Sequence, residues 1–357
     1  MPVRRYGYTR GWHRWAAAGA DFLGQPLRRA RAAPHPVRSI LLIRVARFGD
    51  VVLALPALEH LRREHPAARI AWLVRPEYAD FLRDAAPEAE IIPVRRGALR
   101  RRRFDLAFEF HGHPRWIAVA RRHAAWISGH GIRGLGFLLD ADAPGAGTAG
   151  LPVHESPRLS LAPTWQAAAA QVLGPRSEPF VLFHPGCGQP SKAWPEENWR
   201  ALIVRCAAGG MQAVLAGGPD DRSLCARLAS GLPGLTDIAG LTGWSGLAGT
   251  VARARAVVAP DTGIIHLARA LGIPTVALFG PTDPNRWAAA AGKRDRVLSH
   301  ALPCSHCDLG RCPALPRGSR FSPCLQAISA LQAWQALQQA LALPASQPTP
   351  LRHAQPA

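Results

Sequence analysis

The chain has 357 residues, 48% of them hydrophobic, and carries a formal net charge of +19. That length suits two α/β domains, each with an ample core. No run of about 18 uncharged apolar residues occurs, so we expect no membrane-spanning helix. The basic N-terminus also lacks the apolar stretch and small-residue cleavage site of a secretory signal, and we therefore expect a cytoplasmic protein.

The positive charge predicts attraction to acidic partners. Of the 43 cationic residues, 41 are Arg, and only Lys192 and Lys293 are Lys. The densest cluster is Arg95, Arg96 and residues 100–103. Anionic lipid or a phosphorylated glycan fits such a surface. Nucleic acid is not expected as a partner, because no aromatic side chains are interleaved with these arginines.

Residues 1–37 form a basic N-terminal extension that is rich in Arg and Ala. Two interpretations stay open for it. Residues 12–31 either form a basic helix that contacts the inner face of the membrane, or belong to a frayed extension.

A first α/β domain is expected at residues 38–165. Helical patterns alternate with apolar runs, which predicts a doubly wound parallel sheet. We expect Pro56 to kink the helix that follows the first strand. Residues 140–178, rich in Gly, Pro, Ala and Ser, are the expected linker, with one helix at 164–173. The predicted strands are residues 39–45, 69–74, 91–94, 104–110 and 125–128.

A second α/β domain is expected at residues 175–325. A helix at 326–343 has apolar residues all round and is expected to pack across both domains. Residues 344–357 are expected to be disordered. The predicted strands of this domain are residues 180–184, 212–216, 256–259 and 275–279.

Residues 257–284 are the most informative for function. An apolar strand runs into Asp261-Thr262-Gly263, and a short amphipathic helix and a second buried strand follow. Thr262 is a good helix cap and Gly263 leaves the backbone N–H groups approachable, so the helix start suits an anion such as a diphosphate. Asp261 is placed to accept hydrogen bonds from hydroxyls or loop amides. The alternative interpretation is an ordinary capped turn.

Four of the seven cysteines are clustered with the spacing C-x2-C-x4-C-x11-C. Such thiols bind zinc or an iron–sulfur cluster, form disulfides in an exported protein, or stay unligated. Only the first pair has a familiar ligand spacing, so the sequence leaves these alternatives open. The four residues are Cys304, Cys307, Cys312 and Cys324.

Four separated motifs occur in one order: IRVARFGDVVLALPAL at 43–58, FHPGCGQPSKAWPEENW at 183–199, GGPDD at 217–221 and PDTGIIHLARALGIPTVALFGPTDP at 260–284. On these motifs the chain, over residues 38–325, resembles glycosyltransferase family 9, the lipopolysaccharide heptosyltransferases and their relatives. The resemblance implies a GT-B fold, in which two doubly wound, Rossmann-like α/β domains face a cleft.

The resemblance also implies a reaction. The family transfers a sugar with inversion, typically from ADP-heptose, to an anionic lipopolysaccharide acceptor, without a catalytic metal or a cofactor. We therefore expect a nucleotide-sugar donor and an enzyme bound peripherally to the cytoplasmic face of the inner membrane.

The catalytic residues implied by the resemblance are Asp50 and Lys192. Asp50 matches the general base, which inversion requires on the face of the sugar opposite the leaving nucleotide. Its alternative interpretation is a helix cap. Lys192 matches the lysine that offsets charge on the departing nucleotide, with a solvated loop lysine as the alternative.

Six further residues are implied in donor binding. Asp261 matches the residue that binds sugar hydroxyls, and Asp221 matches a position, often Glu, that holds the ribose. His266 is either a phosphate ligand or a half-buried histidine of the core. The six donor-binding residues are Ser191, Asp221, Asp261, Thr262, Gly263 and His266.

The acceptor site departs from the family pattern, because Ala46-Arg47-Phe48 replaces small hydroxyl residues before Gly49-Asp50. Arg47 suits an acceptor phosphate or carboxylate. Together with the arginine cluster, His111 and Arg115 suit an acidic acceptor, and the alternative is a solvated surface.

Two other functions stay open. One is a GT-B sugar-nucleotide epimerase, which needs no acceptor, and the other is a catalytically inactive paralogue that binds glycan or membrane. A nicotinamide-dependent dehydrogenase is not expected, because no G-x-G-x-x-G follows the first strand of either domain.

Overall fold

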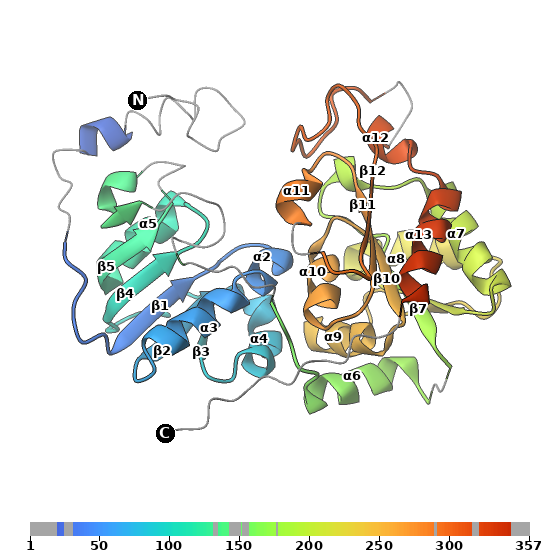
Figure 1. Ribbon diagram of the computed structural model, residues 1–357. Coiled ribbons are helices and arrows are strands. Elements are labelled where there is room, and N and C mark those ends of the chain that lie inside the picture. The colour runs from blue at the N-terminus through green and yellow to red at the C-terminus, as the bar shows by residue number, and fades with distance from the viewer. Residues whose placement is uncertain are drawn as a thin grey trace. The chain divides into compact units, whose positions relative to one another are not determined.

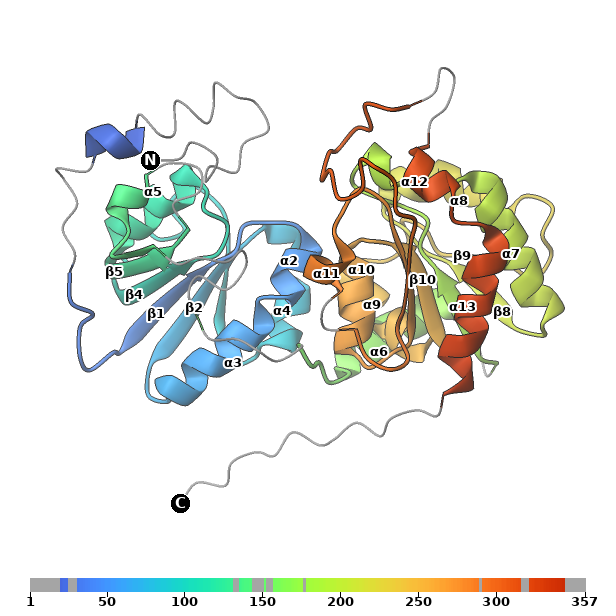
Figure 2. The same cartoon turned by 45° about the horizontal axis from the view of Figure 1, so that its top comes forward.

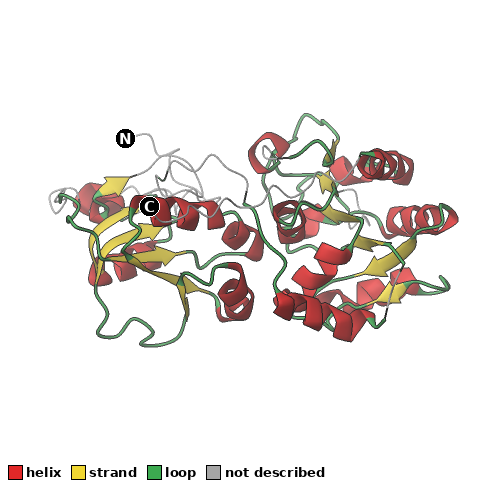
Figure 3. Ribbon diagram, turned by 60° about the horizontal axis from the view of Figure 1, so that its bottom comes forward, coloured by secondary structure: helices red, strands yellow, loops and turns green. Residues whose placement is uncertain are grey.

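The computed structural model describes residues 20–24, 31–130, 135–142, 151, 157–175, 178–288, 291–315 and 321–343. The chain divides into two compact units, Met1–Pro157 and Arg158–Ala357. Each unit holds a six-stranded sheet with helices packed on it (Figures 1 and 3). The expected tail at 344–357 and most of the extension at 1–37 lie outside the described residues.

The sheet of the first unit is parallel throughout and has the strand order β3-β2-β1-β4-β5-β6. β1 is buried from Ile40 to Ile43, as a strand covered on both faces requires. All five expected strands are present, and β6 is a short addition at the edge. The strands are β1 (Ser39–Ile43), β2 (Arg69–Val74), β3 (Glu90–Pro93), β4 (Phe104–Glu109), β5 (Ala124–Gly129) and β6 (Ala141–Asp142).

The helix after β1 is interrupted close to Pro56, where we expected a kink. Its first part ends at Val52, and Pro56 lies in the first turn of the second part, where a missing N–H costs no hydrogen bond. Right-handed crossovers place α3 and α4 on one face of the sheet and α5 on the other (Figure 1). The helices are α2 (Phe48–Val52), α3 (Leu55–Glu64), α4 (Ala79–Ala85) and α5 (Pro114–His123), with 3-10 turns η3 (Pro76–Tyr78) and η4 (Gly136–Leu138).

The second unit repeats this topology, with the parallel order β12-β11-β10-β7-β8-β9. β7, β10 and β11 are buried along their whole length. The two edge strands β9 and β12 carry weaker apolar patterns and escape prediction. The strands are β7 (Phe180–Phe183), β8 (Gln212–Leu215), β9 (Thr236–Asp237), β10 (Ala256–Pro260), β11 (Thr275–Phe279) and β12 (Arg296–Ser299).

Two helices of this unit lie outside the strand-to-strand crossovers of the sheet. α6, placed in the linker by the sequence, packs against α9. α13 begins with a Ser329–Gln332 capping box and packs against α7 and strands β10 to β12 of its own unit (Figure 2). The helices are α6 (Pro163–Leu173), α7 (Glu196–Ala208), α8 (Arg222–Ala229), α9 (Trp244–Arg253), α10 (Gly263–Ala270), α11 (Pro284–Trp287), α12 (Pro323–Gln326) and α13 (Ala330–Ala342), with 3-10 turns η5 (Pro190–Lys192) and η6 (Pro219–Asp221).

The strand order decides where a ligand can bind. In each sheet the chain runs outward from a central strand in one direction and then in the other, so the order reverses between β1 and β4 and between β7 and β10. Open α/β sheets bind ligands outside the carboxyl ends of the strands at this reversal. Each unit therefore has one favoured place for a site.

The packing of α6 on α9 leaves no room for a side chain at Gly249. A Cβ there would lie 1.9 Å from the carbonyl oxygen of Trp165. We predict that Gly249→Ala lowers the free energy of unfolding by about 1–3 kcal/mol, because one backbone must move. Urea-induced unfolding measures this change.

Gly246→Ala is the matched control in the same helix. There the nearest atom to an added Cβ is 3.4 Å away, on Thr242. This variant should keep the stability of the wild type or gain up to about 1 kcal/mol through helix propensity. Equal stability of the two variants would contradict the close crossing.

Candidate active site

Asp50 lies at the strand-order reversal of the first unit, in α2 directly after β1. Its Oδ1 accepts a hydrogen bond from Arg44 Nη2 at 2.8 Å, and its backbone oxygen accepts one from Arg44 Nε at 3.1 Å. Asp50 does not occupy the N-cap position of α2, which is Arg47. Its side chain is 19% exposed, whereas that of Arg44 is 5% exposed. The carboxylate therefore has one oxygen tied to a buried cation and one open side.

Glu109 ends β4 beside this pair and is completely buried. Its carboxylate accepts hydrogen bonds from the backbone N–H groups of Gly112, at 2.5 Å, and His111, at 3.2 Å. Burial raises the pKa of Glu109 to about 7, although these amides and the charge of Arg44 act in the opposite direction. The network thus holds two carboxyl groups and one guanidinium at the reversal.

The three residues expected to bind the acceptor also belong to the first unit. Arg47 is exposed at the start of α2, and His111 is half-buried in the loop after β4. Arg115 is exposed in the first turn of α5, and its guanidinium lies over the ring of Trp116, 4.8 Å from the centroid. All three follow the carboxyl ends of β1 or β4.

Lys192 and Asp261 meet at the reversal of the second unit. Lys192 Nζ donates to Asp261 Oδ2 at 2.7 Å and to the Asp261 backbone oxygen at 3.0 Å. Thr282 Oγ1 donates to the same Oδ2 at 2.7 Å. The side chains of Lys192 and Asp261 are 14% and 6% exposed. Lys192 is thus a fixed cation near the surface and not a solvated loop residue.

The start of α10 follows Asp261 and presents backbone N–H groups. Thr262 occupies the N-cap position, but its hydroxyl donates to Pro260 O at 3.2 Å and makes no capping bond. In the described part of the chain no acceptor is recorded for the amides of Thr262, Gly263 and Ile264. His266 is buried one turn later, with its ring centroid 6.5 Å from that of Trp287. A helix start of this kind attracts anions.

Asp221 caps its own glycine loop and lies close against a second one. Its Oδ2 accepts from Gly218 N at 2.8 Å, and an added Cβ on Gly186 would lie 2.2 Å from the same oxygen. Burial lowers the pKa of the neighbouring His184, and the charge of Asp221 opposes that shift. Asp221 therefore has a structural task in addition to the ribose contact expected from the sequence.

Ser191 is buried and its hydroxyl is already engaged. Oγ donates to Leu309 O at 2.6 Å, and the Ser191 amide donates to Gly310 O at 3.3 Å. Through these bonds Ser191 fixes the 309–310 loop beside η5, the turn that carries Lys192.

The clustered cysteines share one small cavity. All four line it, together with Gly280 and Leu302, and all four are free thiols. Burial raises the pKa of Cys324, and the charges of Cys312 and Cys307 act in the same direction. Among the residues that the structure describes, no three His, Cys, Asp or Glu side chains are arranged to hold a metal ion.

Sequence reasoning missed three members of these sites: Arg44, Glu109 and Thr282. A signal existed for the first two, since each is a charged residue at the end of an otherwise apolar strand, in ILLIRV and LAFEF. Thr282 lies in the motif at 260–284, but the sequence does not show that its hydroxyl bonds to Asp261.

Solved structures of high similarity share this architecture. The Escherichia coli ADP-heptose lipopolysaccharide heptosyltransferase II matches with a TM-score of 0.71 and 20% identity, over 85% of this chain and 98% of that one. A glycosyltransferase of family 9 from Veillonella parvula also matches with a TM-score of 0.71, at 19% identity, over 87% and 99%. The fold is thus GT-B, the class of nucleotide-sugar glycosyltransferases built from two such units.

The sequence comparison is more specific. The family described as glycosyltransferase family 9 (heptosyltransferase) matches residues 99–316, more than half of the chain. This chain therefore belongs to glycosyltransferase family 9 and is a glycosyltransferase. Lipopolysaccharide heptosyltransferase 1 of Pseudomonas aeruginosa is 28% identical over 318 residues, 78% of this chain and 88% of that protein. The enzyme of the same name from Escherichia coli K12 is 24% identical over 288 residues, 69% and 88%.

Among the described residues, none of the helices is both long and apolar enough to span a membrane.

The buried carboxyl of Glu109 predicts a pH-dependent stability. A carboxyl whose pKa is raised on folding stabilises the folded state below its unfolded pKa, and this contribution is lost as the pH rises to the folded value. For Glu109 those values are 4.5 and about 7. We predict that the free energy of unfolding falls across this window by up to about 3 kcal/mol.

Glu109→Gln should remove that part of the pH dependence, because the amide does not ionise. Urea unfolding of both proteins at a series of pH values measures the difference. An unchanged slope in the variant would show that Glu109 is ionised in the folded protein throughout this window.

Proposed function

We propose that this glycosyltransferase transfers heptose, with inversion, from ADP-heptose to an anionic lipopolysaccharide acceptor. The observation that carries the proposal is that the base and the cation expected from the family motifs lie at the strand-order reversals of the two sheets. The names of the similar Pseudomonas and Escherichia proteins support the choice of substrates.

Asp50 is the proposed general base. The acceptor hydroxyl oxygen bonds to the anomeric carbon of the sugar while the bond from that carbon to the diphosphate oxygen breaks. The hydroxyl proton passes to the Asp50 carboxylate, and the electron pair of the broken bond stays on the departing ADP. A base is needed because the hydroxyl becomes strongly acidic only as the new bond forms.

Lys192 and the start of α10 are the proposed partners of the diphosphate. Asp261 accepts hydrogen bonds from two of the three N–H groups of the Lys192 ammonium, which leaves the third for a ligand. The amides of Thr262 and Gly263 add the positive end of the helix dipole. These groups stabilise the charge that grows on ADP and need no metal ion for that task. Asp261 Oδ1 is proposed to accept from a sugar hydroxyl, and His266, one turn into α10, is proposed to support the phosphate site from behind.

A groove in the first unit is the proposed site for the acidic part of the acceptor. The connection from β3 to β4, residues 94–103, contains turns but no helix, although it crosses the sheet face that α5 covers in part. A cavity of about 770 Å³ remains between this connection and α5. Its size is typical of ligand pockets.

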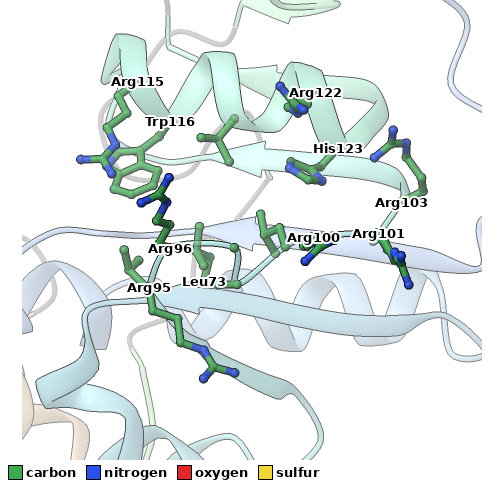
Figure 4. Close-up of a pocket in the computed structure, with 15 residues that line it drawn as sticks. Leu73, Arg95, Arg96, Arg100, Arg101, Arg103, Arg115, Trp116, Arg122 and His123 are labelled. Atoms are coloured by element: carbon green, nitrogen blue, oxygen red, sulfur yellow. The ribbon is translucent and has the colours of Figure 1, made fainter.

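The walls of the groove are cationic and its floor is apolar. Figure 4 shows Arg95, Arg96 and Arg100 with Leu73 on one side, and Arg115, Trp116 and Arg122 of α5 on the other. In the described part of the chain no carboxylate pairs with any of these arginines. An acceptor that carries phosphates or carboxylates on an apolar body fits this arrangement. The same charge supports the proposed peripheral association with the cytoplasmic face of the inner membrane.

Asp50→Ala tests the base. We predict that it lowers kcat by roughly 10²–10⁴-fold, the usual contribution of general base catalysis, and leaves the affinity for ADP unchanged because the donor groups lie in the other unit. Transfer from ADP-heptose to core-truncated lipopolysaccharide and calorimetric titration with ADP measure the two effects. Full turnover by the variant would exclude Asp50 as the base.

Lys192→Ala should behave differently, weakening ADP binding as well as turnover. The same two assays apply, with Lys293→Ala as the control, since Lys293 is the other lysine of the chain. Conversion of ADP-heptose without an acceptor would instead favour an epimerase. Absence of both reactions in the wild type would favour an inactive paralogue.

The arginine groove predicts salt-dependent acceptor binding. The triple variant Arg96→Gln, Arg100→Gln, Arg115→Gln should raise the KM for the acceptor by roughly tenfold and flatten its dependence on ionic strength. A control with the same loss of charge changes Arg63, Arg205 and Arg311, which are exposed elsewhere. Equal effects of the two variants would mean that only net charge matters.

A further inference from the structure

Arg44 is almost completely buried, unlike the arginines of ordinary surface ion pairs. It follows β1 directly, and 4% of the residue is exposed. A buried guanidinium is retained only when neighbouring groups satisfy its charge and its donors. In this chain those groups are the side chain and backbone of Asp50, the carbonyl of Phe110 and, above its raised pKa, the ionised carboxylate of Glu109.

Three hydrogen bonds fix the guanidinium in one orientation. Nε and Nη2 both bond to Asp50, at 3.1 Å to its backbone oxygen and 2.8 Å to Oδ1, and Nη1 donates to Phe110 O at 2.5 Å. Arg44 thus connects the loop after β1, which contains Asp50, to the loop after β4, which begins at Phe110, across the strand-order reversal. A shift of the guanidinium would break contacts with both loops at once.

The Phe110 carbonyl is itself held in place. The next two backbone N–H groups, those of His111 and Gly112, donate to the buried carboxylate of Glu109. Gly112 has φ of +65°, which lets the loop turn back over that carboxylate. Glu109 therefore orders the loop whose carbonyl orients Arg44.

The consequence for Asp50 is a defined orientation. Oδ1 is bound by Arg44, while no partner is recorded for Oδ2 in the described part of the chain. Bond formation by the guanidinium fixes the rotation of the carboxyl group about its χ2 bond, which is otherwise a soft torsion. One oxygen with an available lone pair then faces the open side.

We propose that Arg44 is a positioning residue of the transfer reaction, which holds the Asp50 carboxylate so that Oδ2 receives the proton of the acceptor hydroxyl. This inference rests on the proposed role of Asp50 as the base. Lysine does not replace arginine fully here, because one ammonium cannot reach two oxygens of Asp50 and the Phe110 carbonyl in the geometry of a planar fork.

The first test separates turnover from binding. Arg44→Gln should lower kcat by about 100-fold, the effect of a misplaced catalytic group, with the affinity for ADP and the KM for the acceptor unchanged. Arg44→Lys should recover part of this loss. An unchanged kcat in Arg44→Gln, or a change in ADP affinity equal to the loss of kcat, would overturn the proposal.

A double-mutant cycle tests whether Arg44 acts through Asp50. In the Asp50→Asn background, Arg44→Gln should cost no more than about twofold, because the base that it orients is already gone. A further loss of about 100-fold in that background would show that Arg44 acts independently of Asp50 and would overturn the proposal. Should Arg44→Gln fail to fold, Arg44→Lys enters the same cycle: its smaller loss of kcat should disappear in the Asp50→Asn background, and a loss of the same size in both backgrounds would overturn the proposal.

Chemical rescue gives a signal that a purely structural role would not give. Guanidinium ion at concentrations far below denaturation should restore part of the kcat of Arg44→Ala and should not affect Asp50→Ala. The matched control is Arg121→Ala, which removes another arginine of the first unit that pairs with a buried carboxylate, Asp140, at 2.9 Å. Arg121→Ala should lose stability but keep kcat.

The outcomes distinguish this inference from the proposed function. If Asp50→Ala retains full turnover, the role of the base fails and the inference fails with it. If Asp50→Ala abolishes transfer while Arg44→Gln and Arg44→Ala remain as fast as the wild type, the proposed function stands and the role of Arg44 alone is wrong.

Discussion

The strand order of the two parallel sheets determines where the candidate functional side chains of this protein lie. In each unit the strand order reverses next to a central strand. The loops after β1 and β4 therefore meet at the carboxyl ends of the strands in the first sheet, and the loops after β7 and β10 meet at those ends in the second sheet. Beyond the carboxyl ends of the strands, the backbone no longer forms the hydrogen bonds of the sheet. Side chains of the loops therefore have room to bind one another, and each unit has one largely buried ion pair there.

The two ion pairs share a design. In each, a cation is bound by an Asp carboxylate and also by a backbone carbonyl, Phe110 O in the first unit and Asp261 O in the second. Removing a cation from water is costly, and a charge pair alone seldom compensates for it. The added carbonyl bonds satisfy further N–H groups of each cation. Both cations are consequently rigid, which suits groups that must meet a substrate at a fixed position.

Several residues identified from motifs also form hydrogen bonds that stabilise the loops of the second unit. Ser191 is bonded to Leu309, Thr262 to Pro260, and Asp221 to Gly218. Such contacts make the ligand-binding loops stiff before a donor arrives, so less conformational entropy is lost on binding. The motif residues of the second unit thus stabilise the loops and are also candidates for donor binding. Substitution of one of them would affect both the loop conformation and the binding of the donor.

The sequence by itself determined the class of the fold, nearly all central strands and most residues of the candidate site. Alternation of apolar runs with amphipathic helices is a local pattern, and Asp50, Lys192 and Asp261 stand in contiguous motifs. Short edge strands such as β6 and β9 were missed because two residues carry too little pattern. The sequence does not specify that α6 packs on α9 or that α13 packs on α7, because an apolar helix does not indicate which surface it covers.

Only the tertiary structure decided how the charged groups are paired. Arg44 reaches Asp50 within one loop, but its third bond goes to Phe110, which lies 66 residues away in the chain. Lys192 meets Asp261 across 69 residues, and Thr282 joins them from a third loop. Sequence patterns report which face of an element is apolar, whereas pairing between charges depends on distances that exist only once the strands are in register.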